Sequence, residues 1–140
     1  MTIPDWMLLG FATWTLVILI GTVGVYRWSL ILSGRAAVNA FPARPIEGAD
    51  WYRRGVRAHA NCIENLPVFA VIVFAMHLAG VEGELPNALT VAVMAARLGQ
   101  SLVHLCLVQT ARAVAVRFSF LLVQLVCFLW LVALIVRRLA

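Results

Sequence analysis

Four long apolar segments, separated by short polar stretches, make up most of the chain. The clearest, Trp6 to Tyr26, carries no charged residue over 21 positions. A helix rises about 1.5 Å per residue and about 20 residues cross the hydrocarbon core of a bilayer, so this segment is long enough to span a membrane. The pattern predicts helical spans at about 6–33, 51–80, 86–109 and 113–136. The sequence contains no alternating strand pattern and no repeat.

This pattern predicts an all-α fold, an integral membrane four-helix bundle that forms one domain over residues 1–140. The composition supports it, because 64% of the residues are hydrophobic, 12% are charged and the mean hydropathy is +0.97. Soluble domains are about 45–50% apolar and about 25% charged. These values exclude a disordered chain and an ordinary soluble globule. We do not expect the first span to be a cleaved signal peptide, because the residues before it include Asp5 and no cation, and its apolar run is too long.

The basic residues are all arginines, and they are unevenly distributed. There are 11 of them against six acidic residues, which gives a formal net charge of +5. Because they lie at span ends and inside spans, they do not form a nucleic-acid-binding patch. The first and third loops, with the adjoining helix starts, carry Arg35, Arg44, Arg53, Arg54, Arg57, Arg112 and Arg117. The positive-inside rule therefore predicts cytoplasmic loops one and three, with both termini outside the cytoplasm.

Two spans carry polar residues at a helical spacing of i, i+4 and i+7. These residues are Arg57, Asn61 and Glu64 in the second span, and Arg97, Ser101 and His104 in the third. Residues at this spacing share one helix face, and charged groups in lipid are expected to face the bundle interior and pair. We therefore expect Glu64 to pair with Arg97. The face is either a polar clamp that fixes helix register or an arginine-rich pocket for an anionic ligand, open to the cytoplasm.

The remaining cysteines and histidines predict no metal site. Cys62, Cys106 and Cys127 lie in apolar segments without a CxxC pair, so we expect small buried thiols rather than disulfides or zinc ligands. His77 is expected to be a core histidine. His104 shares the face of Arg97, and for it a core role and a pocket role are equally open.

The second span resembles a known family signature. Its run Arg57-Ala58-His59-Ala60-Asn61-Cys62-Ile63-Glu64-Asn65-Leu66-Pro67 is similar to the pattern Arg-Ala-x-x-Asn-x-x-Glu followed by Pro in the MAPEG family, the membrane-associated proteins in eicosanoid and glutathione metabolism. Chain length, four-span plan and the arginine of the third span are also similar. The chain looks like a bacterial-type member, which implies the bacterial inner membrane.

The resemblance implies a homotrimer that holds glutathione, as cosubstrate, between neighbouring protomers. It implies a glutathione transferase of the microsomal type, or a peroxidase, that acts on hydrophobic electrophiles or lipid hydroperoxides reaching the site from the bilayer. The positions implied to bind glutathione are Arg35, Arg57, Asn61, Glu64 and Arg97, with His104 as a further candidate. Family enzymes also place an arginine at the start of the fourth helix, where it stabilises the nucleophilic thiolate. Arg117 fits that role because the residues after it, Phe118-Ser119-Phe120, are similar to those that follow the family arginine. Arg112 fits it because its distance along the sequence from Arg97 is closer to the family spacing.

Departures from the family pattern leave two rival functions open. His104 and Phe120 stand where family enzymes carry tyrosines, and Gln100 stands where one carries a histidine. The missing hydroxyls favour a non-enzymatic lipid-binding scaffold of the same family. The other rival is a small four-span transporter with Glu64 as a proton-coupled site. The neighbouring arginines argue against a transporter, because nearby cations hold the Glu64 carboxylate in its ionised form.

Overall fold

The computed structural model describes residues 1–41 and 48–140, which include no strand. The elements are α1 (Ile3–Ile18), η1 (Leu19–Gly24), α2 (Val25–Leu32), α3 (Asp50–Ala79), α4 (Glu84–Cys106) and α5 (Ala111–Leu139). The first three run on as one helix, so the described residues form four helices long and apolar enough to span a membrane. The protein is therefore a multi-pass integral membrane protein, and the predicted all-α four-helix fold is confirmed. Arg44, used above for the topology, lies outside the described residues.

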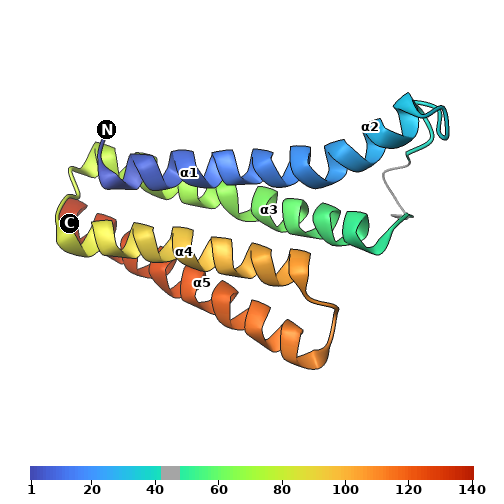
Figure 1. Ribbon diagram of the computed structural model, residues 1–140. Coiled ribbons are helices and arrows are strands. Elements are labelled where there is room, and N and C mark those ends of the chain that lie inside the picture. Colours follow the sequence, from blue (N-terminus) through green and yellow to red (C-terminus); the bar gives the residue numbers. More distant parts are fainter. Residues whose placement is uncertain (42–47) are drawn as a thin grey trace.

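The helices run alternately up and down the bundle (Figure 1). Both termini lie at one end, beside the connection between α3 and α4. The end of α2, the start of α3 and the loop between α4 and α5 lie at the other end (Figure 1). The predicted arginine-rich loops therefore share one end of the molecule. The side of the membrane that this end faces stays a prediction.

The first span contains a π-helical segment, Leu19–Gly24, which the apolar pattern does not predict. Within it, the Thr22 hydroxyl donates to the backbone oxygen of Ile18 at 2.6 Å. The Thr22 side chain lies so close to Gly55 of α3 that a Cβ at position 55 would overlap it. The first span and α3 therefore approach closely here, and only glycine allows this distance.

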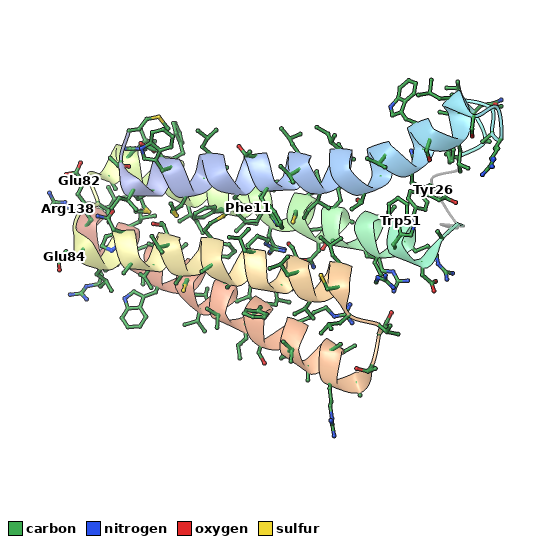
Figure 2. All side chains as sticks on the ribbon, in the orientation of Figure 1. Phe11, Tyr26, Trp51, Glu82, Glu84 and Arg138 are labelled. Atoms are coloured by element: carbon green, nitrogen blue, oxygen red, sulfur yellow. The ribbon has the colours of Figure 1, made fainter. Side chains whose placement is uncertain are left out.

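An aromatic cluster fixes the start of α3, the element that carries the candidate arginine Arg57. The rings of Tyr26 and Tyr52 stack with centroids 4.1 Å apart, and Trp51 meets Tyr26 edge-on at 5.4 Å. Arg27 Nε donates to the Tyr52 hydroxyl at 3.0 Å. Tyr26 and Trp51 lie side by side at the end of the bundle opposite the termini (Figure 2). These contacts join α2 to α3 at the end that holds the arginine-rich loops.

The core is built around three phenylalanines. Phe11 of α1 lies in the middle of the bundle (Figure 2) and contacts Phe69 of α3, whose ring in turn lies 5.9 Å from that of Phe128 on α5. Cys62 and Cys127 are buried as expected, but Cys106 is exposed because it is the last residue of α4. Apolar side chains such as Phe74, Leu78 and Leu129 point outward. In a membrane protein these side chains contact lipid or another protein chain.

Candidate functional site

A small cavity at the end of the bundle that holds the α4–α5 loop brings several candidate residues together. Its volume is about 130 Å³, and its lining is Asp50, Arg54, Arg57, His104, Leu107, Val108, Gln109 and Arg117. Three of these residues are arginines, two from α3 and one from α5, whereas α4 supplies the histidine. The one acidic residue of the lining, Asp50, is paired with Arg53 in its own helix turn. The cavity is therefore cationic and suits an anionic ligand.

Hydrogen bonds hold these cationic side chains in place. Arg57 Nη1 donates to Gln109 Oε1 at 2.6 Å, and Arg54 Nε donates to the backbone oxygen of Leu105 at 3.0 Å. Arg117 Nη1 lies 3.0 Å from His104 Nδ1. A guanidinium can only donate, so His104 accepts on Nδ1 and a neutral imidazole carries its proton on Nε2. The cavity therefore has fixed arginines and a histidine with one assigned tautomer.

The two candidate arginines of α5 occupy different surroundings. Arg117 lines the cavity, whereas Arg112 is exposed in the first turn of the helix and is not part of the lining. They are five positions apart, which is about 140° around a helix, so both cannot face the same cavity. The geometry therefore favours Arg117 over Arg112 as the arginine that meets a ligand there.

Deeper in the bundle, Arg97 of α4 is fully buried and makes contacts that the sequence does not predict. Its Nη1 donates to Asn61 Oδ1 and, at 3.4 Å, to the Asn61 backbone oxygen. Its Nη2 donates to Gln124 Oε1 at 2.6 Å, and its guanidinium carbon lies 5.0 Å from the centre of the Phe11 ring. Arg97 thus joins α3, α4 and α5 at the centre of the bundle.

The predicted ion pair between Glu64 and Arg97 is wrong. Ion pairs within residues 1–41 and 48–140 are limited to Asp50–Arg53 and Asp5–His77. Glu64 lies exposed on the single chain, whereas Asn61 faces Arg97. The two positions differ by about 60° around the helix, and the rotation of α3 directs Asn61 inward.

Two buried glutamines extend this polar network toward the cavity. Gln124 Nε2 donates to Gln100 Oε1 at 3.0 Å, and Gln100 Nε2 donates to the backbone oxygen of Arg117 at 3.3 Å. Each of these two glutamines could have been recognised in the sequence as a polar residue of the bundle interior. Gln100 follows Arg97 at i+3 and so shares its face, and Gln124 is an isolated amide in the apolar fourth span.

The sequence of the chain also matches a known family directly. Residues 8–137 match the sequence profile of the MAPEG family. The chain belongs to the MAPEG family. This confirms the resemblance drawn from the second span, and it supports a membrane function related to glutathione in general terms. None of the curated proteins compared with the chain matches it.

Four of the positions that the MAPEG resemblance implies for ligand binding are not part of the cavity lining in the single chain, namely Arg35, Asn61, Glu64 and Arg97. Arg35 is exposed just beyond α2, and Glu64 is exposed near the middle of α3. The cavity is also smaller than the range of about 300–1,000 Å³ typical of ligand pockets. The cavity in the single chain of this MAPEG protein therefore includes only some of the positions that the resemblance implies.

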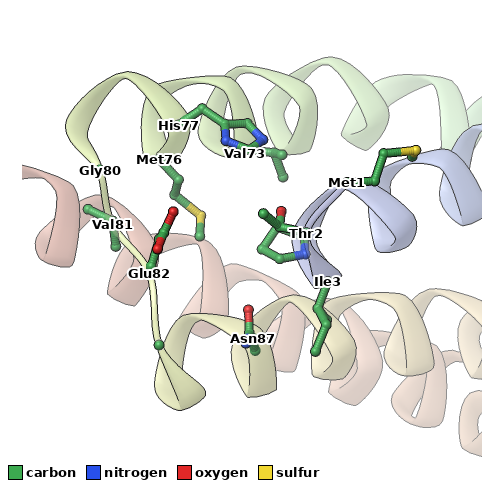
Figure 3. A pocket seen from close by; sticks show the side chains of 12 residues that line it. Met1, Thr2, Ile3, Val73, Met76, His77, Gly80, Val81, Glu82 and Asn87 are labelled. Carbon is green, nitrogen blue, oxygen red and sulfur yellow. The ribbon is translucent and has the colours of Figure 1, made fainter.

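A second cavity lies at the opposite end of the bundle, beside the termini (Figure 3). It is larger, about 380 Å³, and its lining includes the first residues of the chain with His77, Glu82 and Asn87. His77 is not the core residue that its sequence position predicts, because its side chain is half-exposed and bonded to Asp5 at 2.5 Å. Figure 3 shows Glu82 beside Met76 and below His77. This lining includes a carboxylate and no arginine, so it does not suit an anionic peptide despite its size.

Proposed function

We propose that the protein binds glutathione at the cationic cavity and transfers it to hydrophobic electrophiles, or uses it to reduce lipid hydroperoxides. The observation that carries this proposal is the meeting of Arg54, Arg57 and Arg117 with His104 around one cavity. Glutathione carries two carboxylates, and guanidinium groups bind carboxylates through paired, charge-assisted hydrogen bonds. Family membership supports glutathione over other anions.

In this proposal Arg117 acts on the sulfur of glutathione. The thiolate is the nucleophilic form of a thiol, and a neighbouring cation favours it over the neutral form. The thiolate attacks an electrophilic carbon, a carbon–sulfur bond forms, and the leaving group departs with its electron pair. With a hydroperoxide, the thiolate attacks the terminal oxygen, the O–O bond breaks and the alcohol is released. A second glutathione then converts the sulfenic acid to the disulfide and water. The Nε2 proton of His104 offers a donor to the charged atoms.

The active assembly in this proposal is a homotrimer whose neighbouring protomers complete each site. An exposed carboxylate at the middle of a spanning helix costs about 2.5–3.5 kcal/mol in lipid, and contact with a second protein chain removes that cost. Glu64 lies at this position in α3. The small size of the cavity supports the same arrangement. Arg35 and Glu64 then belong to the walls that protomers share, whereas Asn61 and Arg97 shape the floor.

The proposed location is the bacterial inner membrane, with the cationic cavity facing the cytoplasm. The support is the distribution of charge, because the arginines of the first and third loops gather at the cavity end. Arg137 and Arg138 lie near the C-terminus at the other end, where Glu82 and Glu84 offset them (Figure 2). The positive-inside rule then gives both termini outside the cytoplasm.

The test combines binding and turnover with two arginine variants of the same helix. Purified protein in detergent is titrated with glutathione, the thiolate is followed by its ultraviolet absorbance, and conjugation is measured with chlorodinitrobenzene. Arg117→Leu should lower turnover on the order of 100-fold, the loss typical of removing one group that stabilises developing charge, with a smaller effect on affinity. Arg112→Leu should change neither quantity, because its side chain lies outside the cavity.

The opposite pattern, with loss only in Arg112→Leu, would reverse the assignment of the two arginines. Wild-type protein that binds glutathione without favouring its thiolate and without conjugation or peroxide reduction would disprove the catalytic function. That result would support a non-enzymatic lipid-binding scaffold. One observation favours this second candidate, because Phe120 packs its ring against Gly99 and offers no hydroxyl.

A further inference from the structure

We infer that Gln100 and Gln124 are positioning residues for Arg117, which they hold through a buried chain of hydrogen bonds that starts at Arg97. This inference rests on the proposed function in one respect, namely that Arg117 meets the sulfur of glutathione. It goes beyond that function because it assigns a role in the reaction to two amides that lie outside the cavity lining.

The direction of every bond in the chain follows from Arg97. A guanidinium has no acceptor, so Gln124 must present its Oε1 to Arg97 Nη2, at 2.6 Å. The Nε2 of Gln124 then faces Gln100 and donates to its Oε1 at 3.0 Å. Gln100 is thereby left with its own Nε2 toward α5, where it donates to the backbone oxygen of Arg117 at 3.3 Å. The buried cation therefore orients both amides.

Because the chain is buried, its hydrogen bonds cannot be exchanged for others. Arg97 and Gln124 are 0% exposed and Gln100 is 2% exposed, so water cannot substitute for a lost partner. If either amide turned over, two oxygens or two NH₂ groups would face each other in an apolar interior. The second donor position of Gln124 is occupied as well, because Nε2 also donates to the backbone oxygen of Phe120 at 3.0 Å. One orientation of the two amides therefore makes all of these hydrogen bonds at once.

The chain ends on the residue that His104 also holds. Gln100 and His104 are four positions apart on α4 and so lie on one face of the helix. Gln100 binds the backbone of Arg117, and His104 accepts a hydrogen bond from its side chain at 3.0 Å. Close packing supports this contact, because the Phe120 ring lies directly against Gly99 of α4. Arg117 is therefore held against α4 at two points. Gln100 binds its backbone oxygen, and His104 binds its guanidinium.

A purely structural clamp around Arg97 would not need this extension. Asn61 and the Oε1 of Gln124 already satisfy both terminal nitrogens of Arg97. The bonds from Gln124 to Gln100 and from Gln100 to Arg117 satisfy no group of Arg97. Their effect is to hold α5 in register at Arg117, and a misplacement of about 1 Å of a catalytic group can cost about 100-fold in rate.

The experiment uses two variants that break the chain at different bonds. Gln124→Glu keeps an acceptor for Arg97 but removes the Nε2 donor, so Gln100 turns its NH₂ group toward the new carboxylate and its bond to Arg117 is lost. Gln100→Met removes the same bond without touching the acceptors of Arg97. Ser119→Ala is the control, because Ser119 is an exposed residue of α5 whose hydroxyl bonds only within its own helix. Turnover, glutathione affinity and the ultraviolet titration of the bound thiol are measured for the full-length protein.

Both chain variants should lower kcat between about tenfold and 100-fold and move the ionisation of bound glutathione toward that of free glutathione, with affinity within about threefold of wild type. Ser119→Ala should match wild type. If Arg117→Leu changes the thiol titration but Gln100→Met does not, the inference is wrong and the proposed function stands. If Arg117→Leu also leaves the titration unchanged, the proposed function is wrong and the inference is rejected with it. Should Gln124→Glu fail to fold, Gln100→Met decides alone, because it leaves Asn61 and Gln124 in place as acceptors for the two terminal nitrogens of Arg97.

Discussion

Replacing Gln124 with methionine should destabilise the bundle strongly, because it removes an acceptor from a fully buried cation. Gln124 Oε1 accepts from Arg97 Nη2 at 2.6 Å, and both side chains are 0% exposed. Methionine has a similar length and fills the same space, so the change removes hydrogen bonds without leaving a large cavity. The effect therefore reports the polar contacts rather than packing.

The size of the effect follows from the bonds that are lost. A hydrogen bond to a charged group contributes about 1.5–3 kcal/mol and a neutral one about 0.5–1.5 kcal/mol. Gln124→Met loses the charged bond to Arg97 and the neutral bonds to Gln100 and to the backbone oxygen of Phe120, so the free energy of unfolding should fall by about 2.5–6 kcal/mol. Leu129→Met is the matched control on the same helix. Because Leu129 is exposed, this change should stay within about 0.5 kcal/mol of wild type.

A double-mutant cycle tests the partnership itself. Arg97→Met removes the cation that needs the acceptor, so Arg97→Met and Gln124→Met together should cost about 1.5–3 kcal/mol less than the sum of the single changes. Unfolding is followed by circular dichroism during titration with a denaturing detergent in mixed micelles. Protein concentration is held constant, because the stability of the proposed homotrimer would depend on it. Single effects that add within about 0.5 kcal/mol would show that Arg97 and Gln124 are not partners.

Three further predictions address orientation, packing and assembly. With the exposed Cys106 changed to serine, Val38→Cys should react with an impermeant maleimide only after the inner membrane is permeabilised, and reaction in intact cells would reverse the topology. Gly99→Ala places a methyl group 2.7 Å from the Phe120 ring and should cost about 1–3 kcal/mol in detergent unfolding, and an unchanged stability would contradict the close packing of α4 on α5. If Glu64 lies at the subunit contact of the proposed homotrimer, Glu64→Leu should alter the amount of cross-linked trimer but not helix content, since Glu64 has no ion pair among the described residues. A trimer yield equal to wild type would argue against Glu64 at the subunit contact.

The fold could be predicted from the sequence because lipid imposes simple requirements on it. A span must be about 20 apolar residues long and must satisfy its backbone hydrogen bonds internally, so uninterrupted apolar runs give helices. The run from Trp6 to Tyr26 lies within a helix, and each helix in the structure begins and ends within three residues of the span expected for it. The π-helical segment Leu19–Gly24 could not be predicted, because the packing of Thr22 against α3 has no counterpart in local hydropathy.

The polar face of α3 could be predicted only as a set of residues. The i, i+4 and i+7 spacing places Arg57, Asn61 and Glu64 on one side of a helix. It does not determine which of them meets Arg97, because Asn61 and Glu64 differ by about 60° around the helix. The rotation of α3 in the bundle decided that Asn61 binds Arg97 and that Glu64 faces outward.

The same limit applies to the fourth span. Its sequence contains Arg112, Arg117 and an isolated Gln124, and each has a defined position along the helix. Sequence spacing shows that the two arginines point about 140° apart, but not which one faces the cavity. That choice, and the bond from Gln124 to Gln100, depend on how α5 is rotated and shifted against α4. The sequence by itself therefore determined the spans and the residues on each face, whereas the packing of one helix on another decided which of those residues meet.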